Sequence, residues 1–558
     1  MNKRILSFTL ILIFLMQMFI SCTVSDNDGK SESDSSDNVE YIDISKYRII
    51  RPYSAGNDLI KSVSAMKKQI KESTGADISV AIDIDIKGDT ENSYDLIVGN
   101  CDLPGSKAAL EKLSAKRSKK AFIIDVVEKK ISVLGISESD TLIAISYFIK
   151  EIVKKSPKKN CVLLENSSAT IMKKTGELLY VSDNGNTIVL DDVVKISEPK
   201  DAFNFDIRFS YGKIIKLESS GKNNGILLAT NENTQAHEWD IYRSHDDGKT
   251  WQTLNRVPDT INKGIYYGYQ PYLFELPEDV GKYKKGTVLF AGCSYSPTET
   301  NMFLTASTDL GESWNAICNV AEGRGHSSDA WSSDGVWEPV LKYENGRLYC
   351  FYSEELVNGD PITHAGGHCQ RLVYKYTTDL VSWSDVHEMV ALDTPHLRPG
   401  MVALTKMGNG KWALAYEIVG DGGAPIYLKF ADTLDSWTPS EKGKALITVR
   451  GQGLGSGPAI AWTPNGGECG VLFATASGNW GGPSNGSKCD LFLSFDYGET
   501  FISIKNPIND VHDTLSGSSG YSAGMIVDKN GYLYYVNNPE WVKGSSNGKL
   551  MLAKIQIF

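Results

Sequence analysis

The sequence lacks the excess of positive charge that binding to a polyanion requires. Its 57 lysine and arginine residues are outnumbered by 68 aspartate and glutamate residues, which gives a net charge of −11. A protein of this charge does not attract DNA, RNA or anionic lipid through bulk electrostatics. We therefore expect no nucleic-acid partner.

Metal-binding motifs are missing as well. None of the nine cysteines forms a CxxC pair or follows a metal-ligand spacing. His364 and His368 are four residues apart, but no partner ligands accompany them, so a polar loop over 358–370 is the better interpretation. We expect neither a metal nor another cofactor.

The N-terminus carries a targeting segment. Asn2-Lys3-Arg4 is a short basic region, and the nearly all-apolar run Ile5–Ile20 follows it. This pattern is typical of a signal peptide rather than of a membrane span in the mature chain. Phe19-Ile20-Ser21-Cys22 resembles a lipobox, in which the cysteine is acylated and becomes the new N-terminus. A simple secretory signal or an uncleaved anchor is the alternative.

The residues after Cys22 predict a tether and a location. Residues 23–40 are rich in serine, aspartate and asparagine and cannot form a core. An acidic tether in this place resembles a surface-export signal of lipoproteins. We expect a signal peptide over 1–21, a disordered acidic tether over 22–44, and an outer-membrane lipoprotein at the cell surface or in the periplasm.

The chain of 558 residues is too long for a single core, so two or three domains are expected. Residues 45–172 mix short β-rich runs with two helical patterns, one capped by Asn57 and one over Thr141–Lys154. This predicts a small α/β domain, which resembles the accessory domain ahead of the catalytic domain in several secreted glycoside hydrolases. It holds no cluster of acids, histidines or cysteines, so a packing or spacer role is favoured.

From residue 178 to 558 the sequence contains an internal repeat of the form S-x-D-x-G-x-[TS]-[WF]. Full copies are Ser244–Trp251, Ser307–Trp314 and Ser494–Phe501, and degenerate copies are Thr377–Trp383 and Ala431–Trp437. In such a turn the aspartate accepts backbone hydrogen bonds, glycine supplies a positive φ, and the aromatic residue packs between neighbouring units. A repeat of this kind predicts a propeller with the turns in a structural role.

These motifs are Asp-boxes, the hallmark of sialidase-type propellers. The repeat predicts six innermost strands, and we expect them to begin near Ile207, Tyr269, Val336, Leu397, Gly457 and Tyr521. The fold class is therefore predicted as an all-β, six-bladed, sialidase-like β-propeller preceded by the small α/β domain. Glu177–Leu190 is expected to pair with the last blade and close the ring.

The phase of the repeat also predicts where the chemistry lies. All innermost strands of a propeller run in one direction, so their starts and the ends of the second strands share one face. Three glutamates, an arginine and several aromatic or polar residues occupy these positions: Gln270, Trp337, Glu338, Tyr352, Glu354, Arg398, Tyr416, Glu417 and Tyr521. Paired carboxylates across a scissile bond are what most glycosidases need.

Each of these residues also has a structural interpretation. A glutamate beside a proline at a strand start, such as Glu338, could only accept backbone hydrogen bonds, and Arg398 could be a structural bridge. Glu417 ends an apolar strand, where burial would raise its pKa. Their joint occurrence at matched phases favours a functional site.

The order of several segments resembles that of family 93 glycoside hydrolases: Gly335–Pro339, Phe351–Glu354, Arg398–Met401, Ala415–Glu417, Ala461–Gly467 and Tyr521-Ser522. That resemblance implies a six-bladed, retaining exo-α-1,5-L-arabinanase that releases arabinobiose. By the resemblance Glu338 and Glu417 are the catalytic pair and Tyr521 lines the same pocket. We assign Glu338 as acid/base and Glu417 as nucleophile, and the reverse assignment stays open.

The resemblance also sets expectations for partners. The other residues of the face, including Arg398, Trp337 and Gln270, are expected to bind an oligo- or polysaccharide, and the protein is expected to be a monomer attached to the outer membrane. Two features depart from the family pattern: Ala523 stands where the family tends to have arginine, and the loop 358–370 looks like an insertion.

Two other functions remain open at this point. An exo-α-sialidase would need three arginines around the substrate carboxylate and a tyrosine nucleophile with a glutamate partner, for which Tyr521 and Glu417 are candidates. Arg398 is well placed, but Arg208 is followed by Phe209-Ser210 and a third arginine is not evident. The second alternative is a glycan-binding surface lipoprotein without catalytic activity.

Overall fold

The computed structural model of the chain describes residues 41–86, 92–156, 158–165, 169–198, 209–233, 236–324, 334–356, 369–394, 397–482, 489–508, 522–538 and 549–558. The predicted signal peptide, the lipidation site Cys22 and the site residue Tyr521 lie outside the described residues, as do His364 and His368. Among the described residues, no helix combines the length and apolarity needed to cross a bilayer.

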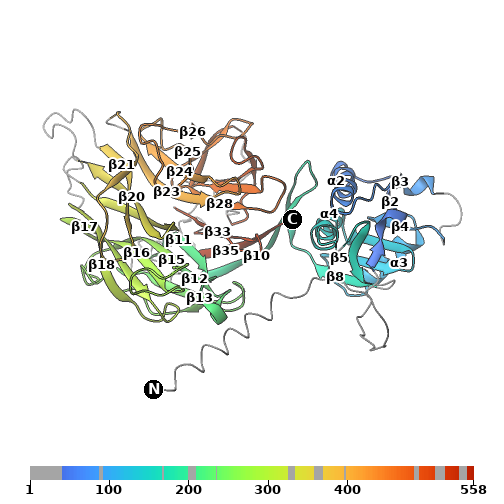
Figure 1. Cartoon of the computed structure of the whole chain (residues 1–558), viewed down its shortest axis with the longest axis horizontal. Coiled ribbons are helices and arrows are strands. Elements are labelled where there is room, and N and C mark those ends of the chain that lie inside the picture. The colour runs from blue at the N-terminus through green and yellow to red at the C-terminus, as the bar shows by residue number, and fades with distance from the viewer. Residues whose placement is uncertain are drawn as a thin grey trace, which may run out of the picture. The chain divides into compact units, whose positions relative to one another are not determined.

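Residues 41–174 form a mixed α/β arrangement (Figure 1). Its six-stranded sheet has the order β3-β2-β4-β6-β5-β8, with β5 antiparallel to both of its neighbours and the other five strands parallel to one another. The strands are β2 (Arg48–Arg51), β3 (Val80–Ile82), β4 (Asp95–Val98), β5 (Ala121–Val127), β6 (Lys130–Gly135) and β8 (Thr170–Lys174). A separate pair joins β1 (Tyr41–Asp43) to β7 (Cys161–Glu165).

The helices of this part differ from the sequence expectation at their ends. Helix α2 (Asn57–Thr74) begins at Asn57 itself, and its cap is Gly56, so the predicted capping role of Asn57 is wrong. Helix α4 (Glu138–Tyr147) starts three residues before the predicted position because Ser137 and Asp140 form a capping box, and a π-helix over Phe148–Val153 continues it. Helix α3 (Pro104–Ser114) was not foreseen.

The remaining part of the chain is a six-bladed β-propeller, which confirms the predicted fold class (Figure 1). The strands of blade 1 are β11 (Phe209–Lys216), β12 (Leu227–Asn233), β13 (Asp240–Ser244) and β14 (Gln252–Thr253); those of blade 2 are β15 (Gly268–Glu275), β16 (Val288–Ser296), β17 (Glu299–Ser307) and β18 (Asn315–Arg324); those of blade 3 are β19 (Val336–Glu344), β20 (Arg347–Leu356), β21 (Cys369–Thr377) and β22 (His387–Val390).

The second half of the propeller follows the same plan. The strands of blade 4 are β23 (Arg398–Lys406), β24 (Trp412–Val419), β25 (Ile426–Ala431) and β26 (Lys444–Ala445); those of blade 5 are β28 (Ala459–Thr463), β29 (Val471–Thr475), β31 (Leu491–Ser494) and β32 (Ile502–Ile504), beside which β27 (Gln452–Gly455) pairs with β30 (Gly478–Gly481); blade 6 begins with β33 (Gly524–Val527), β34 (Leu533–Asn537) and β35 (Leu550–Ile557).

A strand from before blade 1 completes blade 6. Strand β10 (Thr187–Ser197) pairs antiparallel with β35, with Leu190 opposite Ile555, and β9 (Glu177–Val181) pairs with β10. The expectation that the segment around Glu177–Leu190 closes the ring is confirmed. The pairing of β10 with β35 thus joins the segment before blade 1 to the last blade.

The repeated turns connect the third and fourth strands of their blades. In blade 2, Ser313 N–H donates to Asp309 Oδ1 at 2.9 Å, and Ser307 Oγ donates to the same oxygen at 2.7 Å. Leu310 and Gly311 both have positive φ, 62° and 90°. Trp314 then packs against the apolar cluster between blades 1 and 2. Blades 1 and 5 repeat this geometry around Asp246 and Asp496.

Replacing Asp309 by alanine tests this structural role. The Asp309→Ala variant leaves the Ser313 N–H without its acceptor, so we expect the free energy of unfolding to fall by about 1–2 kcal/mol in urea denaturation. Asp432→Ala is the control, because that side chain is 81% exposed, and it should change stability by less than about 0.5 kcal/mol. Equal stability of the two variants would contradict the role.

Candidate active site

Each innermost strand of the propeller starts with one residue in a left-handed backbone conformation. The φ values lie between 51° and 67° for all six residues, which are Tyr211, Gln270, Glu338, Met401, Gly457 and Ser522. In blades 1 to 4 the strand ladder shifts register at this residue, as at a β-bulge. Five of the six are not glycine, so this ring stores backbone strain of the kind found at functional sites.

In blades 1, 3 and 4 the second strand brings one side chain to the level of the left-handed residue. The second-strand residue that carries this side chain pairs with the residue directly before the left-handed one. Ser210 pairs with Glu232, Trp337 with Ser353, and Gly400 with Glu417. Glu232 of blade 1 and Glu417 of blade 4 thus occupy equivalent positions. Glu338, in contrast, is itself the left-handed residue of blade 3.

Glu338 is held by its neighbours on three blades. Its Oε2 accepts hydrogen bonds from Ser353 Oγ at 2.7 Å and from Met401 N–H at 2.9 Å, and its own N–H donates to Gln270 Oε1 at 3.0 Å. Burial raises the pKa of Glu338 to about 7, and the negative charge of Glu417 adds to this effect. Glu338 therefore retains its proton at a pH where an ordinary glutamate is ionised.

Glu417 is the second buried carboxylate of the site, with only 5% of the residue exposed to solvent. Its Oε2 accepts a hydrogen bond from Gly457 N–H at 2.8 Å. Burial raises the pKa of Glu417, whereas that hydrogen bond and the charge of Arg398 act in the opposite direction. The carboxylate therefore has a fixed orientation and an N–H donor that favours its charged form.

Gly400 leaves room between the two carboxylates. A Cβ atom at this position would lie 3.7 Å from Glu417 Oε1 and 3.7 Å from Ser353 Oγ, the group that binds Glu338. The same Cβ would meet Gln370 Nε2 at 2.7 Å. A side chain at position 400 would therefore displace the Gln370 amide and contact Glu417 and Ser353, where the two catalytic candidates approach from adjoining blades.

Arg398 lies beside the pair. Its Nη2 donates to Glu355 Oε1 at 2.7 Å and to Gln370 Oε1 at 2.8 Å. Its Nε is buried and has no hydrogen-bond partner among the described residues. The charge of Arg398 lowers the pKa of both Glu338 and Glu417, so it is near enough to act on both electrostatically.

Three of the predicted substrate-binding residues are engaged elsewhere. Tyr352 and Tyr416 are buried in the apolar clusters between blades, and the Tyr416 hydroxyl donates to the Lys442 carbonyl oxygen. Glu354 accepts a hydrogen bond from Arg371 at 2.6 Å. Successive side chains of a strand point to opposite faces, so these neighbours of Ser353 and Glu417 face away from the carboxylates. The structure thus separates them from Glu338, Glu417, Arg398, Gln270 and the partly exposed Trp337.

A third buried carboxylate, Glu232, is not among the predicted site residues. Ser210 Oγ donates to its Oε2 at 2.5 Å, and Gln270 N–H donates to its Oε1 at 2.6 Å. Burial raises the pKa of Glu232 to about 7. The signal that could have found it is the repeat itself, because Glu232 has the same phase in its blade as Glu417.

A buried lysine, Lys213, was missed as well. Its Nζ donates to the carbonyl oxygen and to Oγ of Ser522, at 3.0 and 2.9 Å. Burial lowers the pKa of Lys213 to about 7, against the opposing effect of the charges on Glu232 and Glu338. Lys213 therefore ties blade 1 to the left-handed residue of blade 6 and stands near two of the three carboxylates.

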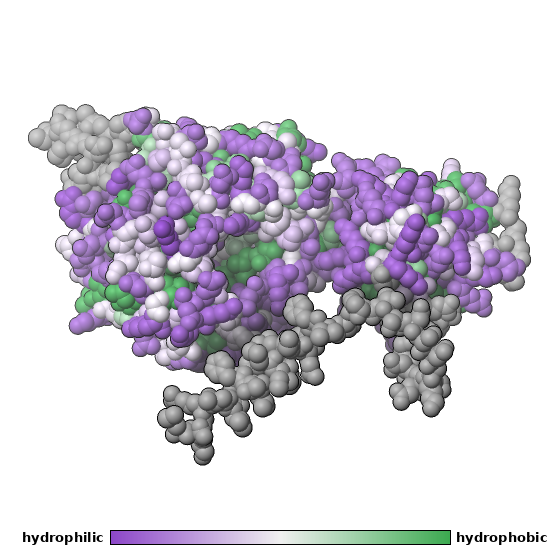
Figure 2. Space-filling model, in the orientation of Figure 1, coloured by the Kyte–Doolittle hydropathy of each residue, from purple (hydrophilic) through white to green (hydrophobic). Residues whose placement is uncertain are grey.

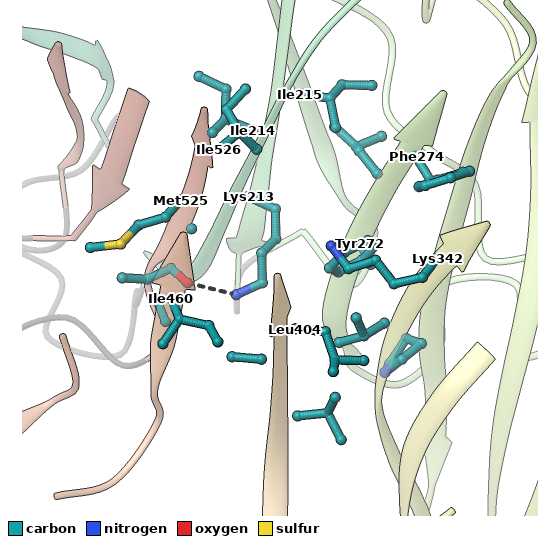
Figure 3. Close-up of a pocket in the computed structure, with 18 of the residues that line it drawn as sticks. Lys213, Ile214, Ile215, Tyr272, Phe274, Lys342, Leu404, Ile460, Met525 and Ile526 are labelled. Atoms are coloured by element: carbon teal, nitrogen blue, oxygen red, sulfur yellow. Dashed lines mark hydrogen bonds between the residues drawn. The ribbon is translucent and has the colours of Figure 1, made fainter. Parts of the chain in front are cut away.

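The innermost strands also surround a cavity of about 420 Å³. Figure 3 shows Lys213 extending into it, with a hydrogen bond drawn from its Nζ, among hydrophobic side chains such as Ile214, Leu404 and Met525. Glu338 and Gln270 are among its lining residues. Hydrophobic side chains are visible in a hollow of the propeller in Figure 2. Within the described residues, no group of three histidine, cysteine or acidic side chains could hold a metal ion.

Comparison with known proteins gives matches among solved structures. No protein-family model matches the chain, and no curated protein sequence matches it. An α-L-arabinanase from Penicillium chrysogenum, solved with arabinobiose, is 31% identical, with 66% of this chain and 98% of that chain covered and a TM-score of 0.54. A family 93 α-L-arabinofuranosidase from Fusarium graminearum, also with arabinobiose, is 25% identical, with 65% and 97% covered and a TM-score of 0.53. An α-L-arabinofuranosidase from Fusarium graminearum in complex with an iminosugar inhibitor gives 25% identity, 65% and 96% coverage, and a TM-score of 0.52.

The raised pKa of Glu338 predicts how stability depends on pH. Its folded pKa of about 7 exceeds the ordinary value of 4.5, so the folded state binds more protons between these values and loses stability as pH rises through them. Glu338→Gln removes this titration. We expect the variant to gain on the order of 2 kcal/mol in unfolding free energy, relative to the natural chain, between pH 5 and pH 8.

Urea denaturation at several pH values measures this difference. Glu388→Gln is the control, because this carboxylate lies on the outer strand of the same blade and is 44% exposed. The control should follow the natural chain at every pH. A constant difference between Glu338→Gln and the natural chain from pH 5 to pH 8 would show that Glu338 is ionised throughout.

Proposed function

Because the chain belongs to glycoside hydrolase family 93, we propose that it is a retaining, exo-acting enzyme that removes short oligosaccharides from α-1,5-linked arabinan or a related glycan. The observation that carries this proposal is the pair Glu338 and Glu417. Two buried carboxyl groups reach the site from adjoining blades, and Gly400 lies next to Glu417 and to Ser353, the residue that binds Glu338. Two carboxyl groups on either side of a glycosidic bond are the machinery of this reaction class.

The electrostatics support a role for each carboxyl group. The charge of Glu417 raises the pKa of Glu338, whereas Glu417 has a backbone N–H donor that favours ionisation. Glu417 therefore ionises first, and its charge keeps the proton on Glu338. This order fits Glu417 as the nucleophile and Glu338 as the general acid.

The reaction proceeds in two displacements in this scheme. Glu417 attacks the anomeric carbon while Glu338 transfers its proton to the glycosidic oxygen, so that the leaving chain departs as an alcohol and a glycosyl ester remains on Glu417. Glu338, now ionised, takes a proton from water as that water attacks the anomeric carbon and the ester bond to Glu417 breaks. Both carboxyl groups then return to their starting states.

Several other residues support these steps. Ser353 and the Met401 N–H orient the Glu338 carboxyl group, and the Gly457 N–H orients that of Glu417. Arg398 is the cation beside both and offers a free Nε–H among the described residues. We assign Arg398 to substrate binding together with Gln270 and Trp337, and we include Tyr521 in the same pocket on the family resemblance.

We further propose that the enzyme is a lipoprotein of the outer membrane. The basic segment, the apolar run and Cys22 at the N-terminus support this location. Metabolic labelling with a palmitate analogue tests it, since Cys22→Ser should abolish the label.

Substitution of the two carboxylates tests the catalytic roles. We expect Glu338→Gln and Glu417→Gln to lower kcat on linear arabinan at least about 1000-fold, because each removes a group that acts in the transition state. Glu388→Gln is the matched control and should retain full activity. Azide should rescue Glu417→Ala with a product of inverted configuration, and it should rescue Glu338→Ala with a retained one.

Those rescue experiments also separate the alternatives. A retained product from Glu417→Ala and an inverted product from Glu338→Ala would show that Glu338 is the nucleophile and Glu417 the general acid. Full activity of both glutamine variants would remove this pair from the mechanism. Activity on sialyllactose, with none on arabinan, would show that the substrate assignment is wrong.

The pH dependence of kcat/KM follows from the pKa shifts. We expect activity to fall above about pH 7 as Glu338 loses its proton, and to fall at low pH with an apparent pKa above 4.5 as Glu417 becomes protonated. An aryl glycoside with a good leaving group needs no general acid, so with it the alkaline fall should largely disappear. An alkaline fall that is identical for both substrates would show that another group is responsible.

A further inference from the structure

Five aromatic rings form a continuous row that starts next to Glu338. Trp337 contacts Tyr295 and Tyr269, with ring centroids 6.3 and 6.4 Å apart. Tyr269 contacts Tyr295 at 5.6 Å and Tyr267 at 6.0 Å, and Tyr267 contacts His237 at 4.9 Å. We call these five residues the aromatic row. It leads from blade 3, across blade 2, to the segment after the second strand of blade 1.

The row is not part of the packed interior of the blades. Tyr267 is 41% exposed, and the other four residues are partly exposed. Tyr269 touches the apolar cluster of blades 2 and 3, but the described clusters do not include Tyr267, Tyr295, Trp337 or His237. Folding alone gives no reason for a line of large rings that remains in contact with solvent, and such surfaces mark binding sites.

The backbone holds the row in place. Tyr269 and Trp337 occupy the same position in blades 2 and 3, directly before the left-handed residue. The Trp337 indole lies against Gly335, where a Cβ atom would come within 2.7 Å of its Nε1. Tyr295 N–H donates to the Tyr267 carbonyl oxygen at 3.2 Å, which joins the outer end of the row to strand β16. The row is therefore preorganised and needs little ordering on binding.

The row also contains an unsatisfied polar atom. His237 Nδ1 is buried and has no hydrogen-bond partner among the described residues, and His237 has a positive φ of 56°. A buried polar atom without a partner is costly, and a hydroxyl group of a ligand beside it would remove this cost. Rings with apolar faces and a free hydrogen-bonding atom are the features that bind a sugar chain.

We propose that the aromatic row binds the leaving part of the glycan, so that the natural substrate is a chain with several sugar residues beyond the scissile bond. This proposal rests on the proposed function, in which Glu338 protonates the leaving oxygen. The row starts at the chain neighbour of Glu338, whereas Glu417 approaches from blade 4, on the other side. The portion that departs with the proton from Glu338 therefore lies over blades 2 and 1, and the uncharged phenol and indole rings suit neutral sugars.

A chain-length series tests the proposal. The kcat/KM values for α-1,5-linked arabinoheptaose and arabinotriose are measured for the natural chain, Tyr267→Ala and Tyr267→Phe. We expect the heptaose-to-triose ratio of kcat/KM to fall about tenfold in Tyr267→Ala, because only the longer substrate reaches this ring. Tyr267→Phe keeps the ring and should restore the ratio. Tyr53→Ala, which removes a 67% exposed tyrosine of the α/β part, is the control and should leave both values unchanged.

The outcomes separate this inference from the proposed function. An unchanged ratio in Tyr267→Ala, or equal losses on both substrates, would overturn the role of the row. A natural chain that hydrolyses neither oligosaccharide would contradict the proposed function. In that case calorimetric titration of the heptaose still decides about the row: about tenfold weaker binding to Tyr267→Ala than to the natural chain supports it, and equal binding to both overturns it.

Discussion

The backbone N–H of the left-handed residue at the start of each inner strand is the group on which the site depends. A bulge turns this N–H out of its own strand ladder, so it needs an acceptor elsewhere. Three buried carboxylates supply one: Gln270 N–H binds Glu232, Met401 N–H binds Glu338, and Gly457 N–H binds Glu417. In each case the donor and the acceptor belong to adjoining blades. The packing of the blades therefore fixes the orientation of the carboxylates.

This arrangement determines which groups carry charge. Burial disfavours ionisation of all three carboxylates, and one N–H donor does not compensate for the lost water. Mutual repulsion then decides the order, since the charge of Glu417 opposes that of Glu338. Lys213, whose own pKa burial lowers to about 7, lies near Glu232 and Glu338 and titrates in the same range. The cluster therefore changes its net charge around neutral pH, where most surface groups do not titrate.

The sequence predicted the propeller because the repeated turns are local, and their spacing identifies the blades. It also predicted Glu338 and Glu417, since each lies at a phase set by those turns. It did not separate Glu417 from Tyr416, or Ser353 from Tyr352, because the bulge on the inner strand shifts the register of that strand against the second one, and sequence alone does not place this shift. Glu232 was overlooked because blade 1 has no family-like segment at its strand start, although the repeat gives Glu232 the same phase as Glu417 and the register of β12 shows their equivalence.

The residue directly before the left-handed position determines the orientation in which the site binds a glycan. It is aromatic in blades 2 and 3, where Tyr269 and Trp337 stand, and small in blades 4 and 5, where Gly400 and Ser456 stand. Equivalent backbones therefore present aromatic rings on one side of Glu338 and small residues on the other. The reacting sugar needs space beside both carboxylates, whereas the leaving chain needs a surface that binds it. Changes of side chain at one repeated position are thus sufficient to orient a polymer across a scaffold with near six-fold symmetry.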